Sequence, residues 1–154
     1  MDETKRESLV AAKAMLAAAR TATLSVIDPD TGGPFGALVN VAVDADLRPI
    51  ILTSTLSRHT QGLLKDARAS IMVHGELPTD RDPLTDMRLT VTGTFTKTTD
   101  IAARACYLQR HPYAELYADF GDFAFWHMQP ERLYVVAGFG RVYNFDMGAV
   151  RAAA

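Results

Sequence analysis

The sequence predicts a mainly β fold with peripheral helices (α+β), in which one antiparallel sheet closes on itself as a small barrel. Five or six short runs rich in β-branched residues are separated by turn-forming residues, and three or so segments have helical periodicity. Closure of the sheet would leave few strand edges unpaired. With 154 residues, of which 48% are hydrophobic, the chain has the size of one domain with a real core.

The expected elements follow one another in a simple order. Residues 4–20 predict an amphipathic helix, because apolar side chains recur there at helical spacing. The predicted strands cover residues 21–27, 36–44, 49–55, 69–74, 87–96, 132–137 and 138–143. The aromatic-rich segment 113–128 receives no prediction. We therefore expect a single domain, 1–154, with an N-terminal helix (1–20), a barrel with helices (21–146) and a tail (147–154).

Two strands have informative faces. In the second strand, one face carries Ala37, Val39, Val41 and Val43. In strand 87–96, an apolar face carries Met87, Leu89, Val91 and Phe95, and the polar face begins at Arg88. The second strand and strand 87–96 are therefore expected to bury one face each.

Two short helices are expected to begin at hydroxyl caps. Ser57 is the predicted cap of a helix that ends at Lys65, and Thr98 or Thr99 that of a second helix. The second helix is expected to place Ile101, Ala105 and Leu108 on one side. Cys106 lies in the middle of this helix, where we interpret it as a small core residue and not as a nucleophile.

Composition and motif content exclude several function classes. A formal charge of −2 is too small a field to attract nucleic acid, and no apolar run is long enough to span a membrane. One cysteine cannot form an intrachain disulfide, which favours a reducing compartment such as the cytoplasm. The four histidines, at 59, 74, 111 and 127, lack metal-ligand spacing, and no dinucleotide fingerprint or P-loop is present, so no protein-ligated metal is predicted.

Residues 54–60 indicate an anion site. A strand there delivers hydroxyls, Arg58 and His59 to a helix N-terminus, where free amides and the helix dipole favour a phosphate. Arg88 heads the polar face of its strand and is expected to join Arg58 and His59 around the same anion. The alternative interpretation is a capped helix start that is merely solvated.

Three ordered blocks resemble a known family over about residues 8–146. Residues 51–73 resemble the strand-helix-strand core of the FMN-binding split-barrel proteins related to pyridoxamine 5'-phosphate oxidase, and Arg88–Gly93 resembles their next strand. Gly121-Asp122-Phe123-x-x-Trp126 and the segment 137–141 resemble the branch that includes haem-utilisation proteins. The resemblance implies an antiparallel split β-barrel of the FMN-binding type.

The same resemblance implies a homodimer with one FMN between the barrels at each site. The expected phosphate contacts are Ser57, Arg58, His59, Thr60 and Arg88. The expected neighbours of the isoalloxazine ring are Leu52, Thr53, Ser54 and the backbone near Val39, Asn40 and Val41. Trp126 is expected to close the site from the partner subunit.

The leading functional hypothesis is an FMN-dependent oxidoreductase that acts on an unidentified small molecule. The flavin would perform the electron or hydride transfer, so no catalytic side chain is predicted. The alternative is a non-catalytic protein of the haem-utilisation type that binds or sequesters haem or flavin. Its candidate axial ligands are His111, Tyr113, Tyr117 and His127. A third hypothesis, a structural barrel, predicts no chromophore.

Overall fold

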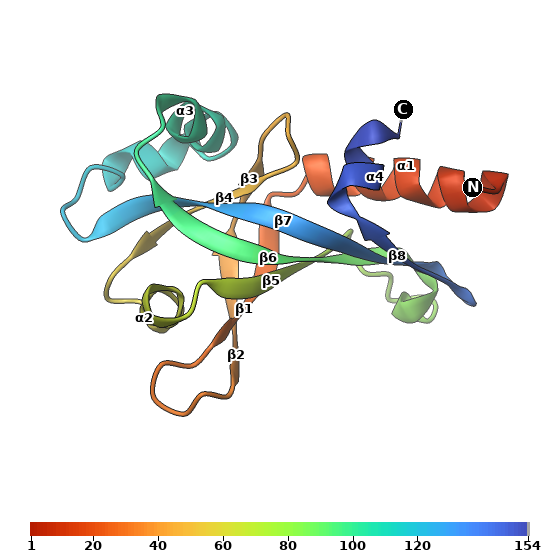
Figure 1. The fold of residues 1–154 in the computed structure, drawn as a ribbon, viewed down its shortest axis with the longest axis horizontal. Helices are drawn as coiled ribbons and strands as arrows, with labels where there is room; N and C mark the ends of the chain where they lie inside the picture. Colours follow the sequence, from red (N-terminus) through yellow and green to blue (C-terminus); the bar gives the residue numbers. More distant parts are fainter. Residues whose placement is uncertain (154) are drawn as a thin grey trace.

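The computed structural model describes residues 1–153 as one sheet with helices packed around it (Figure 1). The helices are α1 (Glu3–Ala17), α2 (Arg58–Lys65), α3 (Ile101–Arg110) and α4 (Met147–Ala152), with the 3-10 helices η1 (Pro83–Thr85) and η2 (Pro112–Leu116). The strands are β1 (Thr21–Ile27), β2 (Pro34–Asn40), β3 (Ala42–Val43), β4 (Pro49–Ser54), β5 (Arg68–His74), β6 (Arg88–Thr98), β7 (Phe123–Gly138) and β8 (Arg141–Asp146).

The strands form a single antiparallel sheet in the order β2-β1-β5-β6-β7-β4-β3, and β8 pairs with β7. Figure 1 shows α1 and α4 together near one end of the long strands, and α2 and α3 near the other end. The predicted class, an antiparallel split barrel with peripheral helices, is confirmed. The structure describes eight strands where five or six were expected. Part of the unassigned segment 113–128 belongs to β7, which begins at Phe123.

The predicted second strand is interrupted at Val41. The Val41 N–H donates to the carbonyl of Arg20 at 2.9 Å, outside the pairing of β2 with β1, and its side chain is fully buried. The expected strand is therefore not continuous, but three of the four residues expected on one face, Val39, Val41 and Val43, do pack in the main core. Within β2 the predicted alternation holds, since Val39 packs against the core while Leu38 is 79% exposed.

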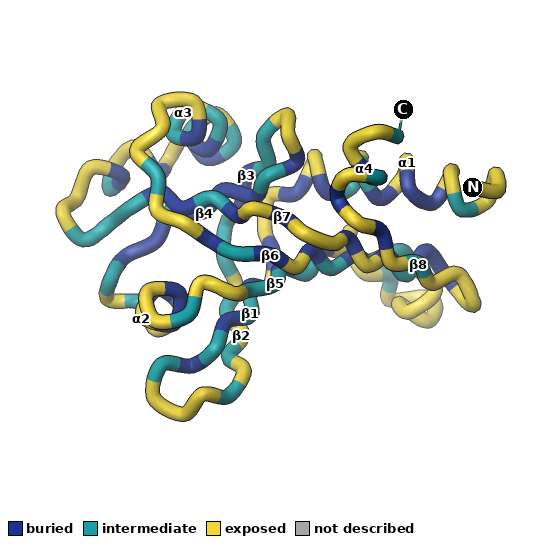
Figure 2. Tube along the Cα trace, viewed as in Figure 1, coloured by how far each residue is buried: buried dark blue, intermediate teal, exposed yellow. Residues whose placement is uncertain are grey.

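The main core lies between the sheet and α1, and Figure 2 shows buried segments along the strands and the inner side of this helix. Leu9 and Leu16 of α1 are completely buried there, beside Leu89, Val91 and Phe95 of β6. The predicted apolar face of β6 is confirmed. A smaller cluster, which includes Tyr107 and Phe125, packs α3 against β4 and β7. These two clusters position both walls of the site described below.

The expected cap of α2 is confirmed in position, with the helix ending at Lys65 as predicted, and the expected cap of α3 is wrong. Ser57 occupies the N-cap position of α2, but its hydroxyl makes no capping hydrogen bond. Asp100 caps α3 by accepting from the N–H of Ala102, because a carboxylate is a stronger acceptor than the hydroxyl of Thr98 or Thr99. Helix α3 therefore begins at Ile101, and its buried face is not the one that the sequence predicts. Ile101 is 83% exposed, and the side chains buried on this helix are those of Ala103 and Tyr107.

Residues 147–154, expected as a tail, contain helix α4. Asp146 caps this helix by accepting from the N–H of Ala149, and Met147 and Val150 are buried in the main core. The segment therefore adds to the core beside α1. Within residues 1–153, every helix is too short or too polar to cross a membrane.

Candidate functional site

A groove of about 300 Å³ lies between β2 and β4, which face each other without strand pairing in the described residues. We call it the seam groove. Its lining residues are Leu38, Val39, Asn40, Leu52, Thr53, Ser54, Ser57, His59, Tyr107, Tyr117 and Phe123. The volume is at the lower end of the range for small-molecule sites. Strands β2 and β4, the first turn of α2, helix α3 and the start of β7 all contribute to it.

The structure brings most of the expected cofactor-binding residues to this groove. Those that line it are Val39, Asn40, Leu52, Thr53, Ser54, Ser57 and His59. Thr60 and Val41 lie behind the wall. The Thr60 hydroxyl is 2.7 Å from that of Thr53, and the Val41 carbonyl accepts from His111 Nε2 at 2.8 Å. The remaining three residues, Arg58, Arg88 and Trp126, do not line the groove.

His59 is held at the wall of the groove by a chain of hydroxyls. Its Nε2 is 2.8 Å from the Thr53 hydroxyl, which also contacts Thr60. Thr53 and Thr60 are 4% and 1% exposed, so this chain is shielded from water. Burial lowers the pKa of His59 below its ordinary value. The imidazole is therefore neutral at pH 7, the form that binds a metal ion.

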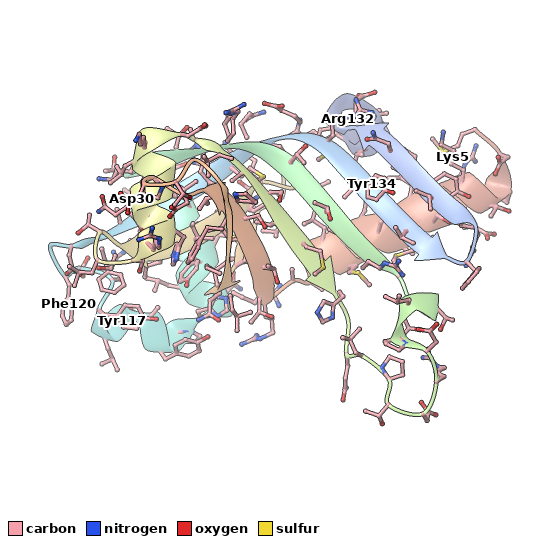
Figure 3. The ribbon with its side chains drawn as sticks, turned by 90° about the horizontal axis from the view of Figure 1, so that it is seen from below. Lys5, Asp30, Tyr117, Phe120, Arg132 and Tyr134 are labelled. Carbon is pink, nitrogen blue, oxygen red and sulfur yellow. The ribbon has the colours of Figure 1, made fainter. Side chains whose placement is uncertain are left out.

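Arg58 is directed away from the groove, toward the β1–β2 connection. Its Nε is 2.6 Å from a carboxylate oxygen of Asp28, and its terminal nitrogen is 3.1 Å from Asp30, which Figure 3 labels beside α2. The hydrogen bond from Arg58 lowers the pKa of Asp28 to about 2. The guanidinium is thus neutralised by two carboxylates of its own chain.

Arg88 is at the opposite end of the sheet. It pairs with His74 at the far end of β5, while Arg68 at the near end follows α2. Six residues of extended strand span roughly 20 Å. The Arg88 guanidinium donates to the Leu84 carbonyl at 2.7 Å. The expected convergence of Arg58, His59 and Arg88 is therefore not formed within the described chain, because strand direction separates them.

Trp126 belongs to the main core. It is 4% exposed, lies opposite Ile51 on β4, and its Nε1 has no hydrogen-bond partner in the described residues. Because alternate residues of β7 point to opposite faces, Trp126 points inward while Phe125 packs under α3. The indole does not project from the surface toward a partner.

Two aromatic residues of the groove, Tyr107 and Phe123, were missed in the sequence, whereas Tyr117 was expected as a ligand. Tyr117 and Phe123 lie in contact with ring centroids 5.0 Å apart and ring planes tilted by 47°, and the Tyr107 ring packs edge to face against Phe125. Burial raises the pKa of Tyr107, so its phenol stays protonated. For Phe123, the high aromatic content of segment 113–128 was the only signal, because that segment has no regular periodicity, and no signal marked Tyr107 in α3.

The expected axial ligands are in different situations. His111 is 1% exposed, with Nε2 donating to the Val41 carbonyl and Nδ1 2.6 Å from the Tyr113 hydroxyl, so both ring nitrogens are engaged. His127 lies opposite Ile50 and does not line the groove. Tyr117 does line it, together with His59. Within residues 1–153, no three His, Cys, Asp or Glu side chains are grouped to hold a metal ion.

The comparisons with known proteins agree with this architecture. The chain is 36% identical over 110 residues to the chloroplastic protein of Arabidopsis thaliana named non-canonical heme oxygenase HOZ. The matched region covers 70% of this chain and 33% of that protein. It is 26% identical to a heme binding protein from Mycobacterium smegmatis, with a TM-score of 0.83, over 99% of this chain and 62% of that one. The chain thus spans about a third of the first relative's length and under two thirds of the second's.

More distant structures share the fold alone. HutZ, the heme storage protein from Vibrio cholerae, is 18% identical with a TM-score of 0.63, over 82% of this chain and 91% of that one.

The family model described as the CREG β-barrel matches residues 3–147, which include all eight strands. The chain therefore belongs to the CREG β-barrel family.

Proposed function

We propose that the chain binds haem in the seam groove. The observation that carries this proposal is the composition of the groove: His59 supplies a neutral imidazole beside the aromatic rings of Tyr117 and Phe123, and no lysine or arginine is among the lining residues. The names of two relatives, a heme oxygenase and a heme binding protein, support the same ligand.

The residues of the groove fit a porphyrin better than a flavin nucleotide. Imidazole nitrogen and phenolate oxygen are both ligands that proteins offer to haem iron, and three groove residues carry such side chains, His59, Tyr107 and Tyr117. Burial keeps the Tyr107 phenol protonated, which leaves His59 and Tyr117 as the candidate ligands. The propionates of a porphyrin sit at one edge and can stay in water. A phosphate dianion instead needs cationic donors, and the carboxylates of Asp28 and Asp30 already occupy Arg58. Bound haem would supply redox and oxygen chemistry.

A hemin titration tests the proposal. The purified chain should develop a saturable Soret band, and His59→Ala or Tyr117→Phe should weaken hemin binding by about tenfold or more if that side chain binds the iron. The control is His74→Ala, which removes an exposed histidine at the far end of β5. Hemin affinity that stays at the wild-type value in both groove variants, or no Soret band at all, would exclude this site.

FMN-dependent electron transfer is the second candidate function, and one observation favours it. Helix α2 begins without a side-chain cap, and Ser57 and His59 of its first turn line the groove. Uncapped amides at a helix N-terminus bind phosphate. An unidentified small molecule would then be the substrate.

One variant separates the two ligands. Asp28→Asn weakens the ion pair that holds Arg58 at the β1–β2 connection, so the guanidinium becomes available to a phosphate at α2. If FMN binds there, a fluorescence titration will show tighter FMN binding in Asp28→Asn, and hemin affinity will stay unchanged. FMN affinity that is absent in both proteins would leave haem as the only ligand supported.

A further inference from the structure

A second cavity lies apart from the seam groove, between the end of α1, strand β3 and helix α3. It has a volume of about 370 Å³, within the range of small-molecule sites. Its lining residues are Arg20, Ala42, Val43, Cys106, Gln109 and Arg110. None of these residues lines the seam groove.

The two arginines of this cavity have no carboxylate partner among residues 1–153. The Arg110 side chain makes only a long hydrogen bond of 3.4 Å to the Ala17 carbonyl, and the Arg20 side chain makes no hydrogen bond or ion pair within residues 1–153. Among the other ten arginines, five pair with aspartates within residues 1–153. Those paired are Arg48, Arg58, Arg68, Arg81 and Arg104. The cavity therefore collects positive charge that the described chain leaves uncompensated.

The acid beside the cavity is paired with an arginine. The Asp44 carboxylate accepts from the side chain and the N–H of Arg48, and its electrostatic effect on Cys106 is opposed by that of Arg110. Burial is the main cause that raises the pKa of the Cys106 thiol, so the thiol is protonated at neutral pH and adds no negative charge. Cys106 is partly buried and packs against the smaller core cluster, as expected of a small core residue, while it also lines the cavity.

We propose that this cavity binds a small oxyanion, a carboxylate or a phosphate, between Arg20 and Arg110. Each guanidinium presents parallel N–H donors that match the two oxygens of such a group. The Gln109 carboxamide supplies a further donor at the rim, and Ala42 and Val43 form an apolar wall. A small anion with one or two charges complements this lining in charge and in size.

Cys106 is the one cysteine of the chain, so it reports on the cavity directly. Saturating succinate or inorganic phosphate should slow its alkylation by iodoacetamide in wild type and not in Arg20→Gln/Arg110→Gln. Protection by succinate alone identifies a carboxylate ligand, and protection by phosphate alone identifies a phosphate ligand. No protection by either anion would overturn the proposal and leave the arginines as partners of the α1 carbonyl end.

The charge of the cavity can be measured in a second way. The anionic reagent iodoacetate and the neutral iodoacetamide both react with the thiolate, so the ratio of their rates is independent of the pKa of Cys106. Two nearby cations should raise this ratio, and Arg20→Gln/Arg110→Gln should lower it by about threefold or more at low salt, with much less effect at 1 M salt.

The matched control is Arg104→Gln, on the same helix, because this arginine pairs with Asp119 outside the cavity. Its rate ratio should equal that of wild type. An equal fall in the ratio in the control and in the double variant would show a general charge effect and contradict the proposed site. Since hemin binding is assigned to the seam groove, the double variant should keep its Soret band whichever way this test falls.

Discussion

Thr53 holds His59 in place at the wall of the seam groove. Thr53→Val keeps the shape of the side chain but removes the hydroxyl that contacts both His59 and Thr60. Because Thr60 is then left with a buried unpaired hydroxyl, we expect the free energy of unfolding to fall by about 1–3 kcal/mol in urea denaturation. Thr53→Ser keeps the hydroxyl and should therefore retain most of the wild-type free energy of unfolding. Equal stability of the valine and serine variants would contradict this role.

Asp28 gives the stability a defined dependence on pH. Arg58 holds the pKa of this carboxyl at about 2, below the ordinary value of about 3.9. The unfolded chain therefore takes up the proton at higher pH, so the stabilisation is complete above about pH 4 and is lost as the pH falls toward about 2.

Urea midpoints at a series of pH values measure this effect. The difference in stability between wild type and Asp28→Asn should be largest near neutral pH and shrink between about pH 4 and about pH 2. The control variant, Asp80→Asn, changes an exposed loop residue and should follow wild type throughout. A wild-type advantage over Asp28→Asn that stays constant down to pH 2 would show that the ion pair does not lower this pKa.

At the scale of elements, Gly62 allows α2 to lie close against β1. A methyl group at this position would be 2.8 Å from the backbone oxygen of Ile27 and 2.9 Å from the side chain of Val26. Alanine in an open helix would be favourable by about 1 kcal/mol, but here the backbone contact should reverse the sign. We expect Gly62→Ala to lower the unfolding free energy by about 1–3 kcal/mol.

Gly36→Ala is the matched control for this prediction. Its added methyl group would meet Thr23 at 3.9 Å, an ordinary contact, so the substitution should change the urea midpoint far less. Displacement of α2 should also move His59, and Gly62→Ala should therefore weaken hemin binding as well. Comparable effects of both substitutions would mean that the close contact of α2 with β1 is not the cause.

At the scale of the whole molecule, exposed apolar side chains surround the seam groove. We call them the apolar rim: Leu38, Leu56, Leu116 and Phe120, which are 58–88% exposed. Leu38 lines the groove, Leu56 and Leu116 adjoin Ser57 and Tyr117, and Figure 3 shows Phe120 at the same end of the molecule as Tyr117. Exposed apolar patches are typical of interfaces. We propose that a second copy of the chain covers the rim and completes the site.

Light scattering tests this proposal. Wild type should have the mass of a dimer, and Leu38→Asp/Leu116→Asp should shift the chain toward the monomer and weaken hemin binding, because the groove loses its second wall. Leu84→Asp is the control, since Leu84 is 60% exposed but lies in η1 beside the first residues of β6, away from the groove. A wild-type monomer, or a dimer unaffected by the rim substitutions, would contradict the proposed interface.

The sequence by itself determined the fold class and most of the groove. Local alternation predicts the buried face of β6, and the segment 53–60 places Thr53, Ser57 and His59 together because they are neighbours in the chain. Only tertiary structure decided the rest. Asp28 meets Arg58 across 30 positions, Arg88 ends at the opposite end of the sheet, and Tyr107 and Phe123 reach the groove from α3 and β7. Contacts between residues that are distant in the sequence depend on strand order and direction, which the local sequence pattern does not predict.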